Sequence, residues 1–302
     1  MKLAIKIDVD GLRPALVGVP RLADALEAQA VGASFLFSVG PDRSGRHIGR
    51  MIRKGMPGRL WRTRRIRNSG VFSVFYGTLL PSPDLGLQAA ATMRTIQESG
   101  FETGVRAFDH IEWRHNAARQ DPDWIGRQMT LAQARYREIL GESPRVHGAA
   151  GWQMSRYAYR FTQRLDFAYS SDTRGTHPFI PVCQAEVISC PQLPTTLPTM
   201  DELIAERGLP GERAVAHLLE LTEDPGRWGH VYSANAAFEG LALLPQFEQL
   251  LRGWRNQGYD IVSLHDYMVS FDTQELPYHE VAIGTVPGRP GLVALQGKEF
   301  LA

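Results

Sequence analysis

Leu3-Ala-Ile-Lys-Ile-Asp-Val-Asp-Gly11 is the stretch that decides the fold of this sequence. Its apolar residues alternate, so residues 3–9 predict a β-strand with the odd-numbered side chains on one face. Lys6, Asp8 and Asp10 then share the other face, and two carboxylates stand at the carboxyl end of the strand. Barrels and open α/β sheets bind ligands at that end, so the pair is a candidate metal ligand and general base. The alternative is a strand that simply enters a polar loop.

Strands and helices alternate along the rest of the chain. Further strands are predicted at 33–38, 102–107, 146–150, 167–170, 229–234 and 259–262. Helices are predicted at 20–30, 84–98, 124–140, 155–164, 201–206, 213–222 and 245–257. This alternation favours an α/β fold with a parallel sheet. Two apolar runs in 278–295 flank a Pro-Gly-Arg-Pro-Gly turn, so we expect one domain over 1–270 with 271–302 as its C-terminal β-hairpin extension.

The 302 residues carry a formal net charge of only +1, which argues against a general nucleic-acid binder. Residues 43–67 hold 10 Lys or Arg and no acidic residue, which leaves 23 basic and 32 acidic residues, a net of −9, elsewhere.

Cys183 and Cys190 lack zinc-site spacing and are too few for a disulfide framework, so we expect free thiols in a reducing compartment. Neither a signal peptide nor a membrane-spanning run is predicted.

The basic segment, residues 43–67, is interpreted as a patch for an anionic membrane surface. Aromatic and apolar residues interrupt its charges, as in an interfacial element. The candidate contacts to a lipid phosphate are Arg50, Arg53, Lys54, Trp61 and Arg62. A solvated face is the plain alternative, and nucleic acid is a weaker one because the rest of the chain is acidic.

Polar residues follow several other predicted strands. His110, after 102–107, is a candidate metal ligand or proton carrier, and Trp152, after 146–150, a candidate wall of a sugar site. Asp172 and Arg174 follow 167–170, and Asn235 follows 229–234. Each alone reads as an ordinary polar loop, but together they have the pattern of a site assembled at the mouth of a barrel.

Several short motifs occur together in one order. They are Lys6-Ile-Asp-Val-Asp10, Phe37-Ser-Val-Gly-Pro-Asp42, Ala149-Ala-Gly-Trp152, Ser171-Asp-Thr-Arg-Gly175, Leu197-Pro-Thr199 and Glu239-Gly240. Together they resemble the polysaccharide deacetylase superfamily of NodB homology. More narrowly, they resemble its deformylases, which act on 4-deoxy-4-formamido-L-arabinose linked to undecaprenyl phosphate.

The resemblance implies a distorted TIM-like (β/α) barrel. It also implies hydrolysis of the formamide C–N bond with a divalent metal (zinc, cobalt or manganese), on the cytoplasmic face of the bacterial inner membrane, for the aminoarabinose modification of lipid A. Asp8 matches the general base, and Asp10 and His110 match metal ligands. Asp172 and Arg174 match a supporting charged pair. Trp152, Asn235 and Arg106 are then expected to contact the sugar.

Three residues depart from the family pattern. Arg106 stands where the first of two metal histidines belongs, Asn235 where a histidine acts as general acid, and Gly11 where threonine is usual. A guanidinium has no lone pair for a metal, and an amide cannot transfer a proton near neutral pH.

Arg106 predicts a bidentate salt bridge to Asp8 and Asp10 that replaces the charge of a metal. The alternative function is therefore a catalytically impaired relative that binds the lipid-linked sugar or the membrane surface. Whether His115, His147 or His177 takes the place of the lost histidine stays open at this point.

Overall fold

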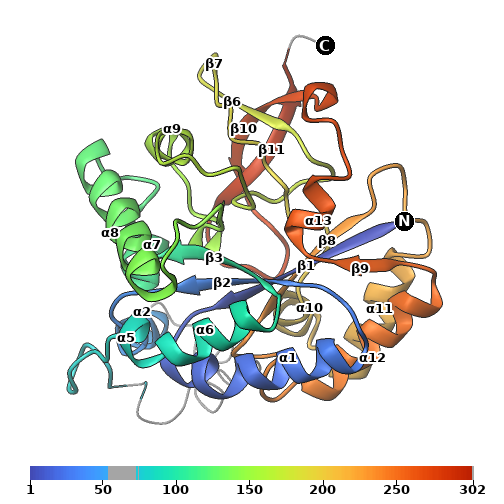
Figure 1. The fold of residues 1–302 in the computed structure, drawn as a ribbon, viewed down its shortest axis with the longest axis horizontal. Coiled ribbons are helices and arrows are strands. Elements are labelled where there is room, and N and C mark those ends of the chain that lie inside the picture. The colour runs from blue at the N-terminus through green and yellow to red at the C-terminus, as the bar shows by residue number, and fades with distance from the viewer. Residues whose placement is uncertain (54–72, 74, 301–302) are drawn as a thin grey trace.

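A large parallel sheet forms the centre of the protein (Figure 1). The structure is a computed structural model that describes residues 1–53, 73 and 75–300. The strands of this sheet are β1 (Lys2–Val9), β2 (Ser34–Ser38), β3 (Glu102–Ala107), β4 (Val146–His147), β5 (Tyr169–Ser170), β8 (His230–Asn235) and β9 (Asp260–Val262). Their order is β5-β4-β3-β2-β1-β8, and β9 pairs with the start of β1. All seven run parallel, so their carboxyl ends lie at one rim.

Strand β1 lies in the middle of the sheet, and both of its faces are buried. Leu3, Ile5, Ile7 and Val9 belong to the main hydrophobic core, with side chains of the helices that cover the sheet. The other face carries Lys6 and Asp8, which are also buried. The alternation in the sequence thus separates an apolar face from a polar face inside the fold.

Helices cover the apolar face of the sheet, with α1 (Val19–Ala28), α6 (Ala90–Glu98) and α12 (Leu244–Asn256) side by side below it in Figure 1. Within the described residues, the other α-helices are α2 (Ser44–Arg53), α5 (Leu85–Gln88), α7 (His110–Asn116), α8 (Pro122–Leu140), α9 (Arg156–Arg164), α10 (Met200–Arg207), α11 (Gly211–Leu221) and α13 (Leu264–Met268). A π-helical segment, Pro14–Gly18, precedes α1, and single 3-10 turns lie at Ala150–Trp152 and Thr273–Glu275.

Most predicted elements appear near their predicted bounds. The predicted helix 84–98 is two helices, because the backbone leaves helical geometry at Ala89. The predicted strand 146–150 ends at His147, where the chain turns toward Ala150–Trp152.

An irregular segment spans the gap between the outer strands β5 and β8. Leu193 donates its N–H to the carbonyl of Ser170 in β5 (2.7 Å), and Thr196 donates to the carbonyl of Val231 in β8 (3.0 Å). The segment therefore continues the wall of the curled sheet without forming a regular strand.

A second, smaller sheet contains the predicted hairpin, β10 (Tyr278–Gly284) and β11 (Val293–Glu299). The hairpin pairs with β6 (Ile180–Cys183) and β7 (Glu186–Val187), two strands that the sequence did not predict, in the order β11-β10-β6-β7. The upper part of Figure 1 shows this sheet above the large one.

Other predictions from composition have different outcomes. Cys183 and Cys190 are buried free thiols, as predicted. Over the described residues, no helix combines the length and apolar character needed to cross a membrane. Arg50 and Arg53 belong to α2, whereas Lys54, Trp61 and Arg62 lie outside the described residues.

Candidate functional site

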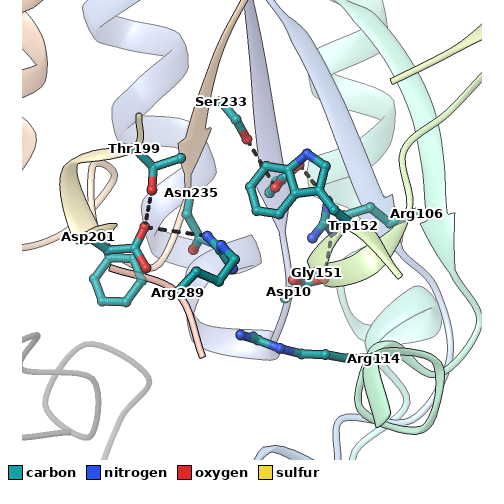
Figure 2. A pocket seen from close by; sticks show the side chains of 12 residues that line it. Asp10, Arg106, Arg114, Gly151, Trp152, Thr199, Asp201, Ser233, Asn235 and Arg289 are labelled. Carbon is teal, nitrogen blue, oxygen red and sulfur yellow. Dashed lines mark hydrogen bonds and ion pairs between the residues drawn. The ribbon is translucent and has the colours of Figure 1, made fainter. Parts of the chain in front are cut away.

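A small pocket opens at the carboxyl ends of the parallel strands, with a cavity volume of about 30 Å³. It is lined by Asp8, Asp10, Arg106, Arg114, Gly151, Trp152, Thr199, Asp201, Ser233, Asn235, Phe238 and Arg289. Figure 2 shows Arg106, Asp10 and Asn235 reaching the same space from β3, the end of β1 and β8. Five residues predicted for the site therefore lie in one pocket: Asp8, Asp10, Arg106, Trp152 and Asn235.

Arg106 bridges the carboxylate pair, Asp8 and Asp10. Its NH1 lies 2.6 Å from Oδ1 of Asp8, and its Nε donates to Oδ1 of Asp10 at 3.1 Å. The Arg106 side chain is only 3% exposed, so the ion pairs are shielded from water. The predicted bidentate salt bridge is therefore confirmed.

A β-bulge presents Arg106 to the pocket. Phe37 of β2 pairs with Val105, but the next residue, Ser38, pairs with Ala107, so Arg106 is the extra residue on β3. Bulges interrupt the ladder and re-aim a side chain, and they are common beside functional sites. The sequence predicted the strand but not this irregularity.

Hydrogen bonds fix both carboxylates of the pair, and nearby charge keeps Asp10 ionised. Ser38 donates its hydroxyl to Oδ1 of Asp10 at 2.6 Å, and Ser233 donates to Oδ2 of Asp8 at 3.2 Å. Burial raises the pKa of the Asp10 carboxyl, but Arg106, His110 and the bond from Ser38 lower it by more, so the net pKa is below its usual value. Asp10 is thus a fixed negative charge at neutral pH.

His110 begins α7 directly after β3. Asp109 caps this helix by accepting the N–H groups of Ile111 and Glu112 at 3.1 and 3.0 Å. His110 is 6% exposed and close enough to Asp10 to lower the pKa of that carboxyl. Two predicted metal ligands thus lie near one another.

Lys6 is a buried cation beside the pair that the sequence analysis did not assign to the site. Its Nζ donates to the carbonyl of Ser171 at 2.7 Å. Burial lowers the pKa of Lys6 to about 8, against the opposing influence of Asp8. The sequence contains a signal for Lys6, because this residue shares a strand face with Asp8.

Asp172 and Arg174, the predicted supporting charged residues, have different partners in the structure. Asp172 accepts from the Ala149 N–H at 2.7 Å and pairs with Nδ1 of His147 at 2.8 Å. Burial raises the pKa of Asp172, but His147 and the bond from Ala149 bring it below its usual value. Arg174 instead pairs with Glu202 at 2.8 Å, because α10 presents that carboxylate to it.

Trp152 is surrounded by cations. The guanidinium of Arg289 lies 4.3 Å from the ring centroid, that of Arg174 5.1 Å, and the ammonium of Lys6 5.2 Å. Arg289 comes from the turn of the C-terminal hairpin and also donates to Glu202 at 2.6 Å. The ring is 3% exposed, so it anchors these cations and leaves little surface for a sugar. The contribution of Arg289 was missed, since a turn carries no sequence signal for such a contact.

Asn235 ends β8 next to Asp8, its register partner on β1. Its side-chain oxygen accepts the N–H of Ala237 at 2.9 Å, and its own N–H donates to Glu239 at 2.9 Å. Glu239 also accepts the Tyr232 hydroxyl at 3.0 Å, and burial raises its pKa to about 8. Asn235 therefore shapes this turn and supplies an amide, not an acid, to the pocket.

Gly11, which stands at a family threonine position, occupies a backbone conformation that favours glycine. Its φ is +100°, and a Cβ there would meet Oδ2 of Asp42 at 3.3 Å. A threonine in this conformation would be strained, so the turn after Asp10 is built for glycine.

The remaining histidines do not replace the missing metal ligand. His147 is held by Asp172, His115 lies 3.1 Å from His47, and His177 lies 3.1 Å from His279. Within the part of the chain that the structure describes, no three His, Cys, Asp or Glu side chains form a metal-holding group. The residues outside that part, 54–72, 74 and 301–302, include none of these four types. Catalytic zinc sites use three protein ligands, so the donors present here do not complete a site of the zinc type.

Comparisons with known proteins agree with the resemblance predicted from the motifs. The chain is 28% identical over 295 residues to a protein of Shewanella sediminis, covering 98% of this chain and 94% of that protein. It is 26% identical over 283 residues to one of Wigglesworthia glossinidia brevipalpis, covering 93% and 98%. Both are named as probable 4-deoxy-4-formamido-L-arabinose-phosphoundecaprenol deformylases. No family model matches the chain.

Solved structures share the fold at low sequence identity. A protein of Mycobacterium smegmatis assigned as a polysaccharide deacetylase superposes with a TM-score of 0.64 and 15% identity, over 94% of each chain. A family 4 acetyl xylan esterase of Clostridium thermocellum, solved with a cobalt ion, gives 0.52 and 15% over 89% of this chain and 91% of its own. The predicted distorted barrel of the deacetylase type is therefore confirmed, and a divalent metal is present in one protein with this fold.

Proposed function

We propose that this chain, a relative of the formamido-arabinose deformylases with the fold of the polysaccharide deacetylases, hydrolyses the formamide C–N bond of 4-deoxy-4-formamido-L-arabinose linked to undecaprenyl phosphate. Its similarity to the two deformylases, which covers 93% or more of the chain, is the observation that carries the proposal. The pocket at the strand ends, with its carboxylate pair, supplies a place for the reaction. The reaction consumes one water and yields formate and a free amine on the sugar.

Different residues of the pocket have different roles in the amide hydrolysis. Asp8 takes a proton from the attacking water as oxygen adds to the formyl carbon, and Arg106 offers its positive charge to the oxyanion that forms. The C–N bond then breaks, and Asp8 returns the proton to the leaving nitrogen. Asn235 transfers no proton, so its amide orients the formamide by hydrogen bonding. Asp10 and His110 supply two donors only, so we route no step through a metal, and the choice of zinc, cobalt or manganese stays a prediction.

A formate-release assay tests this function directly. The purified chain is incubated with the lipid-linked formamido sugar in detergent, and formate and free amine are measured. We expect release by the wild type and a loss of at least about 100-fold in Asp8→Asn, the typical contribution of a general base. Asp123→Asn, an exposed carboxylate at the start of α8, is the matched control and should keep wild-type activity. Sugar binding without any formate release would instead favour the impaired relative.

The substrate carries a polyprenyl chain, so we also propose that the protein acts on the cytoplasmic face of the inner membrane. The basic segment, residues 43–67, is the candidate contact, since each Lys or Arg near an anionic surface contributes about 1 kcal/mol. Co-sedimentation with anionic and neutral vesicles tests this. We expect anionic vesicles alone to retain the protein, and Arg53→Glu with Arg62→Glu to release it. Arg213→Glu with Arg252→Glu, which adds the same charge on α11 and α12, is the control. Equal binding to both vesicle types would reject the contact.

A further inference from the structure

We infer that Arg106 is the built-in cation of this site. Its guanidinium fills the space between Asp8 and Asp10, so that the site keeps its shape and charge without a divalent ion. The single substitution Arg106→His would allow the site to bind a divalent ion. The inference does not depend on the proposed substrate. It follows from which atoms occupy the pocket and from the balance of charge around them.

The oxygens of the carboxylate pair that face one another both contact Arg106, Oδ1 of Asp10 by a hydrogen bond and Oδ1 of Asp8 by an ion pair without hydrogen-bond geometry. Oδ1 of Asp8 lies 2.6 Å from NH1 of Arg106, and Oδ1 of Asp10 receives both Nε of Arg106 and the hydroxyl of Ser38. A metal would need those lone pairs, and it would have to displace a guanidinium that is always protonated. The ion pairs with both carboxylates hold the guanidinium there, at the position where the pairing of β2 and β3 shifts register.

The charges at the pair already balance. Two buried cations, Lys6 and Arg106, face two carboxylates, Asp8 and Asp10, and both cations interact electrostatically with Asp8. A divalent ion would add two positive charges beside two cations that already balance the carboxylate pair. Like charges in a poorly screened interior repel strongly, so binding of the ion is opposed by charge as well as by occupied ligands.

A histidine at position 106 would reverse both effects. Arg106 lies four residues before His110 in the sequence. Both residues lie beside Asp10, Arg106 on β3 and His110 at the start of α7. Arg106→His removes one positive charge and adds an imidazole nitrogen to Asp10 and His110. That gives the three protein ligands that catalytic metal sites of the zinc type use.

Metal titration of the intact protein tests the inference without an activity assay. The wild type and Arg106→His are dialysed against a chelator and titrated with cobalt or zinc chloride in a calorimeter, and thermal unfolding is followed with and without metal. We expect no stoichiometric binding and no thermal shift for the wild type. For Arg106→His we expect one ion per chain. Its affinity should exceed that of the wild type by more than about 100-fold, because the loss of an outer-shell partner alone already lowers metal affinity by up to about 100-fold. The metal should also raise the unfolding temperature of that variant.

Two control variants separate ligand gain from loss of arginine. Arg106→Gln also removes the cation but supplies no imidazole, so it should gain no metal. Arg106→His with Asp10→Asn should lose what Arg106→His gains. One tightly bound ion per wild-type chain would overturn the inference, and so would a folded Arg106→His that binds no better than wild type. If Arg106→His cannot be purified in folded form, the wild-type titration decides alone, since stoichiometric metal there refutes a built-in cation and its absence supports one.

Discussion

At the scale of single residues, two carboxylates placed two positions apart on one buried strand need positive charge close by. Asp8 and Asp10 obtain it from Arg106, which the sequence predicted, and from Lys6, which it did not. The salt bridge could be predicted because a strand-end arginine in a metal-histidine position has few other partners. Lys6 was missed because alternation shows which face a residue shares, but not that both faces are buried.

The first prediction concerns the energy of this ion pair. Arg106→Met should lower the free energy of unfolding by about 3–5 kcal/mol, because it leaves Lys6 alone to balance two buried carboxylates. Urea unfolding monitored by circular dichroism measures the loss. Arg106→Met combined with Asp10→Asn should recover most of it, since one positive and one negative charge are then removed together. Arg252→Met, which breaks an exposed pair with Glu248 on α12, should change little. A fully stable Arg106→Met would show that the pair contributes nothing.

The second prediction concerns pH and Glu239, whose pKa burial raises to about 8. The folded state holds this proton more tightly than the unfolded state, where the pKa is 4.5. Its contribution to stability is therefore complete below pH 4.5 and is lost as the pH rises through 8, at up to about 1.4 kcal/mol per pH unit.

Urea unfolding of wild type and Glu239→Gln at several pH values checks this sign. The stability of the wild type should fall relative to the variant between pH 5 and pH 8, and the difference should level off above that range. Glu98→Gln, an exposed glutamate in α6, should follow the wild type. Parallel curves for wild type and Glu239→Gln would mean that Glu239 titrates normally.

At the scale of elements, the predictions succeeded where periodicity is strong and failed where geometry is irregular. The strand 102–107 was predicted with the bounds of β3, yet its bulge at Arg106 was not, because a bulge leaves the pattern of residue types unchanged. No helix is predicted at the position of α7, because its seven residues give barely two turns of periodicity. The strands β6 and β7 are four and two residues long, and they exist because β10 offers β6 a partner far along the chain.

The third prediction tests how α7 is fixed at the rim of the site. Asp109 caps this helix, and its Oδ2 forms an ion pair with Arg43 at 2.6 Å. Asp109→Ala should therefore cost more than the ~1 kcal/mol of an ordinary N-cap. Asp121→Ala, which removes the exposed cap of α8, is the matched control and should cost about 1 kcal/mol. Chemical denaturation compares the two variants, and Asp109→Asn should fall between them because asparagine retains the cap but loses the charge. Equal losses for the two alanine variants would exclude any contribution from Arg43.

At the scale of the whole molecule, the C-terminal hairpin is tied into the walls of the pocket. Arg174 and the hairpin exchange backbone hydrogen bonds, from Arg174 N–H to the Ala294 carbonyl (2.9 Å) and from Gln296 N–H to the Arg174 carbonyl (2.8 Å). The turn of the hairpin adds Arg289, the second cation on Glu202. We therefore propose that residues 1–270 and 271–302 form one cooperative unit, in which the extension supports the site.

The last prediction follows from that coupling. A chain that ends at Pro277 lacks β10 and β11, so the edge of β6 loses its partner and the buried Glu202 loses one of its two guanidinium groups. An exposed strand edge also promotes aggregation. We expect the shortened chain to lose its cooperative thermal transition, whereas a chain that lacks only residues 301–302 should unfold like the full protein. Calorimetry with static light scattering follows both. Arg289→Met isolates the charge from the sheet edge and should keep a single transition at a lower temperature, because Arg174 still faces Glu202. A chain ending at Pro277 that unfolds at the wild-type temperature would instead make the hairpin an independent appendage.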